Sequence, residues 1–293
     1  MLSNARRRGI LRRRGGQRHA KRQRSEMTAS NAQPAISRRA FTACLALASL
    51  TATGTALMLL GSELASDGRY ADLGTTSRGE PLVNDTTALD ASRDWRALKA
   101  VNPDVAGWLT VSGTSIDLPV VSQRVKDPDG FYLNHDFWRE PSTLGCPYLD
   151  RRSVASGSHL LIYGHHLLWS GEAFSELYRA WEPDHFSNVG EATWETPDGG
   201  AETLIPLCAL RVDAGFADIQ RFGFSGGREE MREWLAGLLD KADARSRNAP
   251  ELATQAQKAM TLVTCSSALP NRRWRTLVLF VETGGSTTAP QSI

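Results

Sequence analysis

The sequence predicts a mostly β protein, folded as a single domain over about residues 89–283 with a few helices inserted between the strands. Short runs of β-branched and aromatic residues recur between turn residues through this part of the chain, and few segments show helical spacing of apolar side chains. With 293 residues, 41% of them hydrophobic, the chain can bury a substantial core. No internal repeat is visible.

Strands are expected wherever an apolar run is bounded by turn residues. The first two, 107–111 and 116–121, are joined by a Ser-Gly-Thr turn and are read as neighbours. Five further strands are expected at 148–150, 158–163, 201–211, 260–265 and 276–282.

Helices are expected to be fewer. Asp90 or Ser92 is predicted to cap a short helix that runs through Leu98. Apolar side chains at helical spacing predict a second helix over 172–181 and a longer amphipathic helix over 225–244. The stretch from Asp240 to Lys258, before the strand that ends at the cysteine, is read as a loop.

Charge is divided unequally along the chain. Residues 1–39 carry twelve Lys or Arg and one acidic residue, which leaves 22 basic and 31 acidic residues, a net charge of −9, in the remainder. Arg, Gly, Ser and Gln dominate this tail, so we expect it to be disordered. Its charge alone would suit nucleic acid, but the apolar segment that follows it favours a membrane protein with no nucleic-acid partner.

Residues 40–61 run for 22 positions without a charge, about the length that a helix needs to cross a bilayer. An arginine pair precedes this segment and acidic residues follow it, so we expect a single-pass anchor with the N-terminus in the cytoplasm and the folded domain outside. The arginine pair also resembles a twin-arginine export signal, but no cleavage site is evident before Asp67. Residues 62–88 are expected to be a linker, and 284–293 a polar tail.

A cysteine ends one predicted strand, and an arginine opens the next. The run TLVTC finishes at Cys265, and Arg275 begins the strand that follows. The ordinary role of a cysteine at a strand end is that of a small buried apolar residue. Here Thr264 and Ser266 are polar neighbours that suggest an opening to solvent, and antiparallel pairing would bring the guanidinium back towards the thiol. Because a nearby cation favours the reactive thiolate, this pair suggests a nucleophile.

Two histidines follow another predicted strand, which stops at Gly164. Glycine permits a sharp turn that can present His165 at the strand end, where its imidazole could act as general acid and base beside Cys265. A polar loop is the alternative reading of His165 and His166. The sequence shows no C-x2-C or H-x3-H spacing, so it predicts no zinc site and no cofactor.

In this order, YGHH, TLVTC and an arginine ten positions after the cysteine resemble the sortases, which are membrane-anchored cysteine transpeptidases of Gram-positive bacteria. Three upstream segments are similar in order and wording to class B sortases: NPDVAGWLTVSGTSIDLPVV from Asn102, DGFYLNHDF from Asp129 and GCPYLDRR from Gly145. The resemblance covers about residues 90–283. It implies an eight-stranded β-barrel with inserted helices.

The resemblance also implies the catalytic roles. Cys265 matches the nucleophile, His165 the catalytic histidine and Arg275 the catalytic arginine, which is preferred over Arg272 and Arg273 because it immediately precedes its strand. The acidic residue that some class B members carry two positions after the cysteine is replaced here by Ser267.

Other residues are assigned roles outside the catalytic group. Leu133, Thr264 and Ser266 are candidates for substrate binding. His135 and Asp136 are interpreted as structural, and His166 as a neighbour of the catalytic histidine. Cys146 and Cys208 could form a disulfide in an oxidising exterior, but two buried thiols are the preferred interpretation.

The implied reaction is a two-step acyl transfer in the thiol-protease manner. The cysteine cleaves another surface protein after the threonine of a C-terminal sorting motif, of an NPxT-like kind, and an amine of peptidoglycan then receives the protein. A cysteine peptidase that hydrolyses the same intermediate, a pilus-assembly sortase and a non-catalytic extracellular binding module are the alternatives.

Overall fold

The computed structural model describes residues 68–78, 93–167, 171, 173–198, 200–266 and 273–284. All of them lie in one compact unit, residues 56–293. The described residues form nine strands: β1 Val105–Val111, β2 Asp117–Ser122, β3 Tyr148–Leu149, β4 His159–Tyr163, β5 Ala192–Glu195, β6 Ala201–Asp213, β7 Ala244–Arg245, β8 Lys258–Cys265 and β9 Trp274–Glu282. The helices are α2 Trp95–Val101, α3 Pro183–Phe186, α4 Gly227–Leu239 and α5 Ala249–Gln255, with 3-10 turns η1 Phe131–Leu133, η2 Ser175–Leu177 and η3 Ala217–Ile219.

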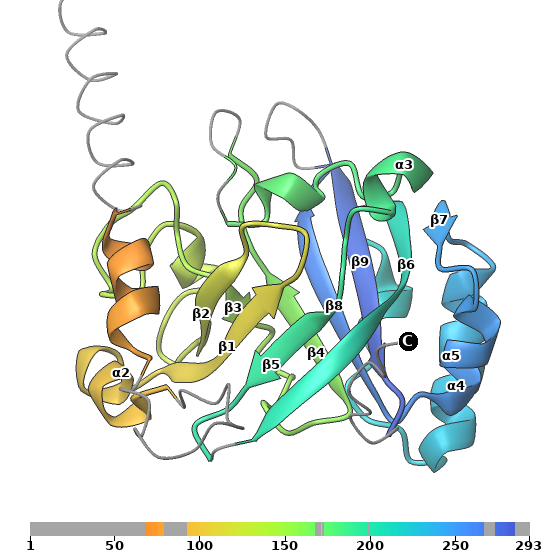
Figure 1. Cartoon of the computed structure of the whole chain (residues 1–293), viewed down its shortest axis with the longest axis horizontal. Helices are drawn as coiled ribbons and strands as arrows, with labels where there is room; N and C mark the ends of the chain where they lie inside the picture. The colour runs from red at the N-terminus through yellow and green to blue at the C-terminus, as the bar shows by residue number, and fades with distance from the viewer. Residues whose placement is uncertain are drawn as a thin grey trace, which may run out of the picture. The chain divides into compact units, whose positions relative to one another are not determined.

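Eight of these strands close into a barrel (Figure 1). Their order is β5-β1-β2-β3-β4-β8-β9-β6, and β6 then pairs with β5 to complete the circle, while the two-residue β7 adds to β6. The β2–β3 and β4–β8 pairs are parallel and the others antiparallel. The prediction of a mostly β, eight-stranded barrel is therefore confirmed.

Three clusters of buried apolar side chains hold this architecture together. One fills the barrel and includes Leu109, Trp194 and Phe280. A second lies outside the barrel wall, where α4 and α5 cover β6, β8 and β9 (Figure 1). Each large side chain that becomes fully buried contributes about 1.5–3 kcal/mol, so the outer layer stabilises the strands that end at the candidate site.

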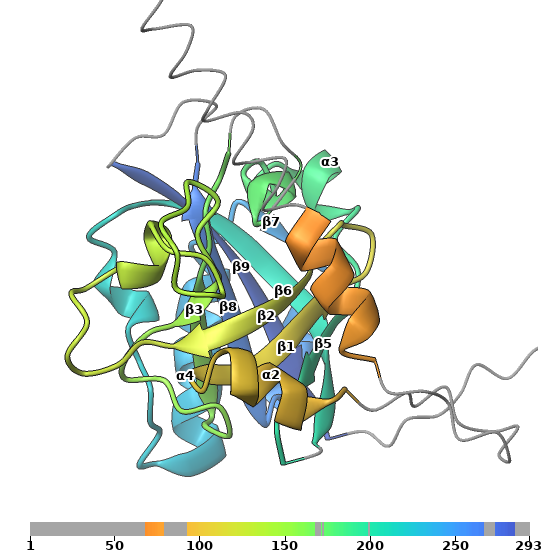
Figure 2. The same ribbon diagram turned by 90° about the vertical axis from the view of Figure 1, so that its left-hand side faces the viewer.

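The third cluster lies beneath the most N-terminal described segment. Residues 68–76 are helical and pack beside α2 and β2 (Figure 2). Tyr70 is buried, and its hydroxyl donates to the carbonyl oxygen of Gly145 at 2.8 Å. Arg69 pairs with Asp136 at 3.3 Å and lies over the ring of Trp138. This part of the segment expected to be a linker is therefore folded onto the barrel.

The helix predicted over 172–181 does not form. Ala173 has a left-handed φ of +51° and pairs with His166 in an isolated bridge, so the backbone there is not α-helical. Only the 3-10 turn η2 follows, with Phe174 and Leu177 buried in the barrel. The spacing of apolar residues therefore predicted correctly that Phe174 and Leu177 are buried, but the prediction of a helix was wrong.

Smaller differences concern element ends. Asp94 caps α2, since its side chain accepts from the backbone N–H of Ala97 at 2.9 Å, and Asp90 and Ser92 lie outside the described residues. Strand β5 was not expected, nor were β7 and α5 in the stretch read as a loop.

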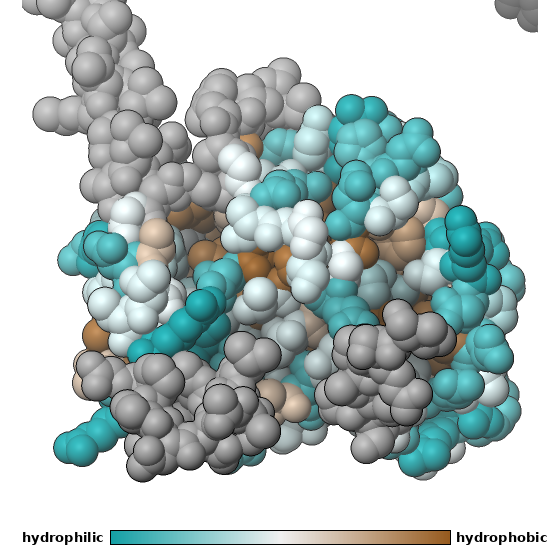
Figure 3. All heavy atoms as spheres, in the orientation of Figure 1, coloured by the Kyte–Doolittle hydropathy of each residue, from teal (hydrophilic) through white to brown (hydrophobic). Residues whose placement is uncertain are grey.

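No described helix is long and apolar enough to cross a membrane. The proposed anchor at 40–61, the basic tail and most of the predicted C-terminal tail lie outside the described residues. On the face shown in Figure 3, hydrophilic side chains dominate the described surface and hydrophobic ones show mainly in recesses between them.

Candidate active site

The nucleophile candidate and the arginine candidate face each other across two strands. In the antiparallel β8–β9 pair, Cys265 is the register partner of Arg275. Directly opposed residues of an antiparallel pair have Cβ atoms about 4.5–5.5 Å apart, on the same face of the sheet. The structure therefore brings these two side chains together, as the sequence predicted.

The histidine candidate follows the strand on the other side of β8. Strand β4 runs parallel to β8 with Tyr163 beside Val263, and the N–H of Gly164 donates to the carbonyl oxygen of Val263 at 3.0 Å. His165 follows two residues after Tyr163, and Cys265 ends β8 two residues after Val263. Val263 and Leu277 pack in the outer cluster, so the alternation of side chains along β8 and β9 places Cys265 and Arg275 on the outer face of the barrel. His165 follows the end of β4, the strand that pairs with β8.

The imidazole of His165 is oriented by a backbone carbonyl. Its Nε2 lies 2.5 Å from the carbonyl oxygen of Leu133. A carbonyl oxygen can only accept, so Nε2 carries the proton and Nδ1 is the nitrogen that can take up or release one. Burial lowers the pKa of His165, and the hydrogen bond to Leu133 partly opposes that shift.

Arg275 and Cys265 are both half-buried. Nη1 of Arg275 donates to the carbonyl oxygen of Trp274 at 3.0 Å, which holds the guanidinium near the start of β9. Its charge reaches the stacked rings of Tyr148 and Tyr163. Burial raises the pKa of Tyr163 to about 12, and Arg275 opposes this rise in both tyrosines.

Thr264 and Ser266 lie on either side of Cys265 in the chain, so they point to the opposite face of the strand. Both are buried, and both hydroxyl groups lack a hydrogen-bond partner among the described residues. Leu133 is half-buried and packs against the cluster beneath residues 68–76. Of the three candidates for substrate binding, Leu133 contacts a catalytic candidate through its carbonyl oxygen, which accepts from Nε2 of His165.

The neighbouring polar residues have other contacts. His166 is buried edge-on against Tyr178, with ring centroids 4.4 Å apart, and its Nδ1 has no partner within the described part of the chain. The ring of His135 stacks on Phe131 at 3.8 Å, and its Nδ1 lies 2.9 Å from the carbonyl oxygen of Phe131. Asp136 accepts from the N–H of Glu140. The contacts of His135 and Asp136 fit the structural roles expected of them.

The arginines that the sequence offered as alternatives to Arg275 are Arg272 and Arg273. Arg273 is exposed, lies over the ring of Trp274 and is 3.8 Å from Asp213, away from the β8–β9 register pair at the site. Arg272 and Ser267 lie outside the described residues.

The two cysteines whose pairing was in question are free thiols. Cys146 and Cys208 are buried in different clusters, and burial raises the pKa of each thiol, to about 12 for Cys208. The described residues contain no group of three or more His, Cys, Asp or Glu that could hold a metal ion.

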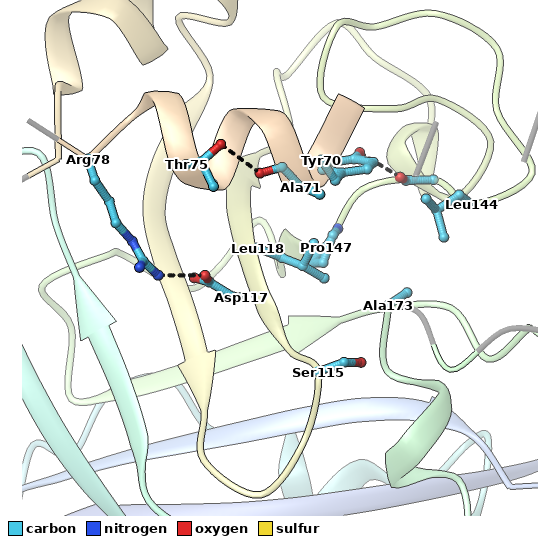
Figure 4. Close-up of a pocket in the computed structure, with 12 residues that line it drawn as sticks. Tyr70, Ala71, Thr75, Arg78, Ser115, Asp117, Leu118, Leu144, Pro147 and Ala173 are labelled. Atoms are coloured by element: carbon cyan, nitrogen blue, oxygen red, sulfur yellow. Dashed lines mark hydrogen bonds and ion pairs between the residues drawn. The ribbon is translucent and has the colours of Figure 1, made fainter. Parts of the chain in front are cut away.

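Two cavities flank the site without containing its three candidates. A cavity of about 440 Å³ lies between residues 68–78, the start of β2 and the segment around Gly145, with the Arg78–Asp117 ion pair at one end and Tyr70 near Leu144 at the other (Figure 4). A cavity of about 420 Å³ is lined by Gly130, Tyr148, Tyr163 and charged residues including Arg151 and Arg152. The second adjoins the strand that leads to His165.

The fold of this protein is similar to that of solved sortase structures. The structure is similar to the X-ray structure of Clostridium perfringens sortase B, with 26% identity and a TM-score of 0.55 over 64% of this chain and 98% of that chain. It is also similar to a Staphylococcus aureus sortase B–substrate complex, with 21% identity and a TM-score of 0.61 over 76% of this chain and 99% of that chain. The fold is that of the sortases.

The sequence comparison is more specific within this class. The chain is 31% identical over 91 residues to sortase B of Listeria monocytogenes, and 35% identical over 75 residues to sortase B of S. aureus. These matches cover 30% and 25% of this chain, and 35% and 30% of the relatives, so they span about a third of the relatives' length. No protein-family model matches. The predicted resemblance to sortases, and to class B among them, is confirmed.

Proposed function

We propose that this protein is a cysteine transpeptidase of the class B sortase type. The observation that carries the proposal is the arrangement of Cys265, His165 and Arg275 at the same end of three adjacent strands of a sortase barrel. A thiol, an imidazole with one nitrogen available for proton transfer and a fixed cation are the groups that acyl transfer through a thioester requires.

In the first step, the thiolate of Cys265 attacks the carbonyl carbon of the threonine in the sorting motif. Arg275 stabilises the negative charge that develops on the carbonyl oxygen. When the peptide bond breaks, Nδ1 of protonated His165 gives its proton to the departing amine. The products are a thioester between the threonine and Cys265 and a released C-terminal peptide.

In the second step, an amine attacks the thioester carbon. Neutral His165 accepts a proton from the amine at Nδ1, and the thiolate of Cys265 leaves as the new amide bond forms. We propose a peptidoglycan amine as the acceptor and a surface protein with an NPxT-like motif as the donor. The expected anchor at 40–61 would hold the enzyme in the cell membrane with the catalytic domain outside.

Incubation of the detergent-solubilised full chain with an NPxT-type peptide library and triglycine tests this proposal. Mass spectrometry should detect peptides cleaved after threonine and joined to triglycine, and Cys265→Ala should abolish them. Cleavage that yields only hydrolysed peptide would favour a peptidase. A folded protein that cleaves no member of a broad library would contradict the proposal.

A further inference from the structure

Three segments outside the catalytic candidates converge on one hydrogen bond of His165. They are the stretch that begins at Asn102, the turn η1 at Phe131–Leu133, and the segment that begins at Gly145. Each contributes an atom that fixes the position of the Leu133 carbonyl, and that carbonyl accepts the Nε2 proton of His165. The proposed mechanism uses none of these segments directly.

The turn η1 is anchored by a buried tyrosine. Tyr132 is fully buried, and its hydroxyl donates to Asp104 at 2.8 Å and accepts from the Asn102 amide at 3.0 Å. Arg139 contacts the same hydroxyl at 2.9 Å and pairs with Asp104 at 2.7 Å. Tyr132 and Asn102 are buried, and Asp104 and Arg139 are half-buried. A side-chain hydrogen-bond network of this kind holds its members rigidly, so the carbonyl of the next residue, Leu133, is fixed in direction.

Gly145 occupies the space between this turn and the imidazole. Its φ is +67°, and a Cβ atom there would lie 2.6 Å from the carbonyl oxygen of Tyr132, 3.1 Å from that of Leu133 and 3.2 Å from Cδ2 of His165. Two of these contacts are with backbone, which cannot rotate away. Only a residue without a side chain lets η1 approach His165 to hydrogen-bond distance.

Hydrogen bonds fix Gly145 from both sides. Its carbonyl oxygen accepts from the Tyr70 hydroxyl, and the N–H of the next residue, Cys146, donates to the carbonyl oxygen of Tyr132 at 2.8 Å. The segment therefore cannot retreat to make room for a Cβ atom without breaking these bonds.

We propose that Gly145 is a positioning residue for the acyl transfer, acting through the Leu133 carbonyl to keep the proton of neutral His165 on Nε2 and to leave Nδ1 for proton exchange with the substrate. The role rests on the proposed function, but the tautomer it sets can be observed without substrate. Gly145 touches no reacting atom.

The test is Gly145→Ala, with Gly227→Ala as the matched control. Gly227 has nearly the same left-handed φ, +65°, but a Cβ atom there has nothing within 4 Å. Both variants therefore carry the strain of alanine at positive φ, and only the first crowds the imidazole. The full chain is labelled with ¹⁵N-histidine, and His165→Gln identifies the His165 resonances.

We expect ¹⁵N spectra above the titration range to show the Nε2–H tautomer for His165 in the wild type and in Gly227→Ala, and a mixture of tautomers in Gly145→Ala. The kcat/KM of Gly145→Ala should fall on the order of 100-fold, since a shift of about 1 Å at a reacting group has an effect of that size. Gly227→Ala should retain the wild-type value.

An unchanged Nε2–H tautomer together with wild-type activity in Gly145→Ala would overturn the proposal, as would a wild-type His165 that carries its proton on Nδ1. If Gly145→Ala does not fold, Tyr132→Phe serves instead, because it removes only the hydroxyl that anchors η1 and should also mix the tautomers. A third outcome separates this proposal from the proposed function. If His165 is the Nε2–H tautomer in the wild type and a mixture of tautomers in Gly145→Ala, but the wild type transfers no peptide, the positioning contact is supported and the proposed function is contradicted.

Discussion

At the scale of single residues, the fold positions the groups of the candidate site in two ways. Strand register places Arg275 opposite Cys265, and a hydrogen bond to the Leu133 carbonyl orients the imidazole of His165. The guanidinium can offer several donors in one plane to a developing oxyanion, which a lysine ammonium cannot reproduce.

Replacement of Arg275 by alanine should therefore lower kcat by a factor of roughly 100–1,000, the usual effect of losing one oxyanion donor. Its half-buried side chain is not part of the apolar core, so the melting temperature should change by only a few degrees. Arg273→Ala is the matched control, because that side chain is exposed two residues away. Equal losses of activity in the two variants would contradict the assignment of the arginine.

A different histidine, His159, should determine part of the acid sensitivity of the fold. Its Nδ1 lies 2.6 Å from the carbonyl oxygen of Arg221 and its Nε2 lies 2.9 Å from the hydroxyl of Thr261. Burial lowers the pKa of His159 to about 4, whereas an exposed histidine has a pKa of about 6.5. The unfolded chain therefore binds this proton more readily than the folded protein.

Stability conferred by neutral His159 is complete above about pH 6.5 and is lost as the pH falls towards 4, by up to about 3 kcal/mol. Urea unfolding at pH 7 and at pH 4.5 measures this loss. His159→Gln should be less stable at pH 7 and should lose less stability between the two pH values. An identical loss in wild type and variant would show that His159 does not titrate as proposed.

At the scale of elements, the sequence predicted the strands well because each is an apolar run bounded by turn residues. Strand β5, Ala192–Glu195, escaped prediction because four residues give too little alternation, and it is defined by pairing with β1 and β6. The helix predicted at 172–181 failed because apolar spacing cannot reveal the left-handed backbone of Ala173.

The catalytic candidates were readable from the sequence for a related reason. Cysteine, histidine and arginine are rare enough at strand ends to attract notice, and the family resemblance named the same three. The Leu133 carbonyl and Gly145 were not recognised as parts of the site, because every residue has a carbonyl and only the fold brings residues 133, 145 and 165 together. A glycine beside a cysteine within a family motif was the only available signal.

The helical segment 68–76 should stabilise the barrel through Tyr70. Its hydroxyl donates to the Gly145 carbonyl and accepts from the N–H of Phe137 at 2.9 Å. Tyr70→Phe leaves both buried groups without a partner, so the free energy of unfolding should fall by about 1–3 kcal/mol.

Chemical denaturation measures that difference. Thr75→Val is the control, because the Thr75 hydroxyl is exposed and bonds only within its own helical segment; we expect its stability to change by less than about 0.5 kcal/mol. A loss in Tyr70→Phe no larger than the control's would mean that this segment contributes little to the folded barrel.

At the scale of the whole molecule, barrel closure separates the cysteines by environment. Cys265 ends β8 half-buried at the barrel end, whereas Cys146 and Cys208 are buried among apolar side chains. A thiol that is enclosed and has a raised pKa reacts slowly with any acyl donor. The fold thus predicts selective acylation at a single described cysteine, whichever sorting motif the protein prefers.

The assignment of Cys265 as the nucleophile is tested by locating the acyl group after the full chain reacts with an NPxT-type peptide in the absence of an added amine. Intact-mass spectrometry followed by peptide mapping should find one adduct, on Cys265, that triglycine removes and that Cys265→Ala prevents. An adduct on Cys146 or Cys208 instead, or one that persists in Cys265→Ala, would contradict the account.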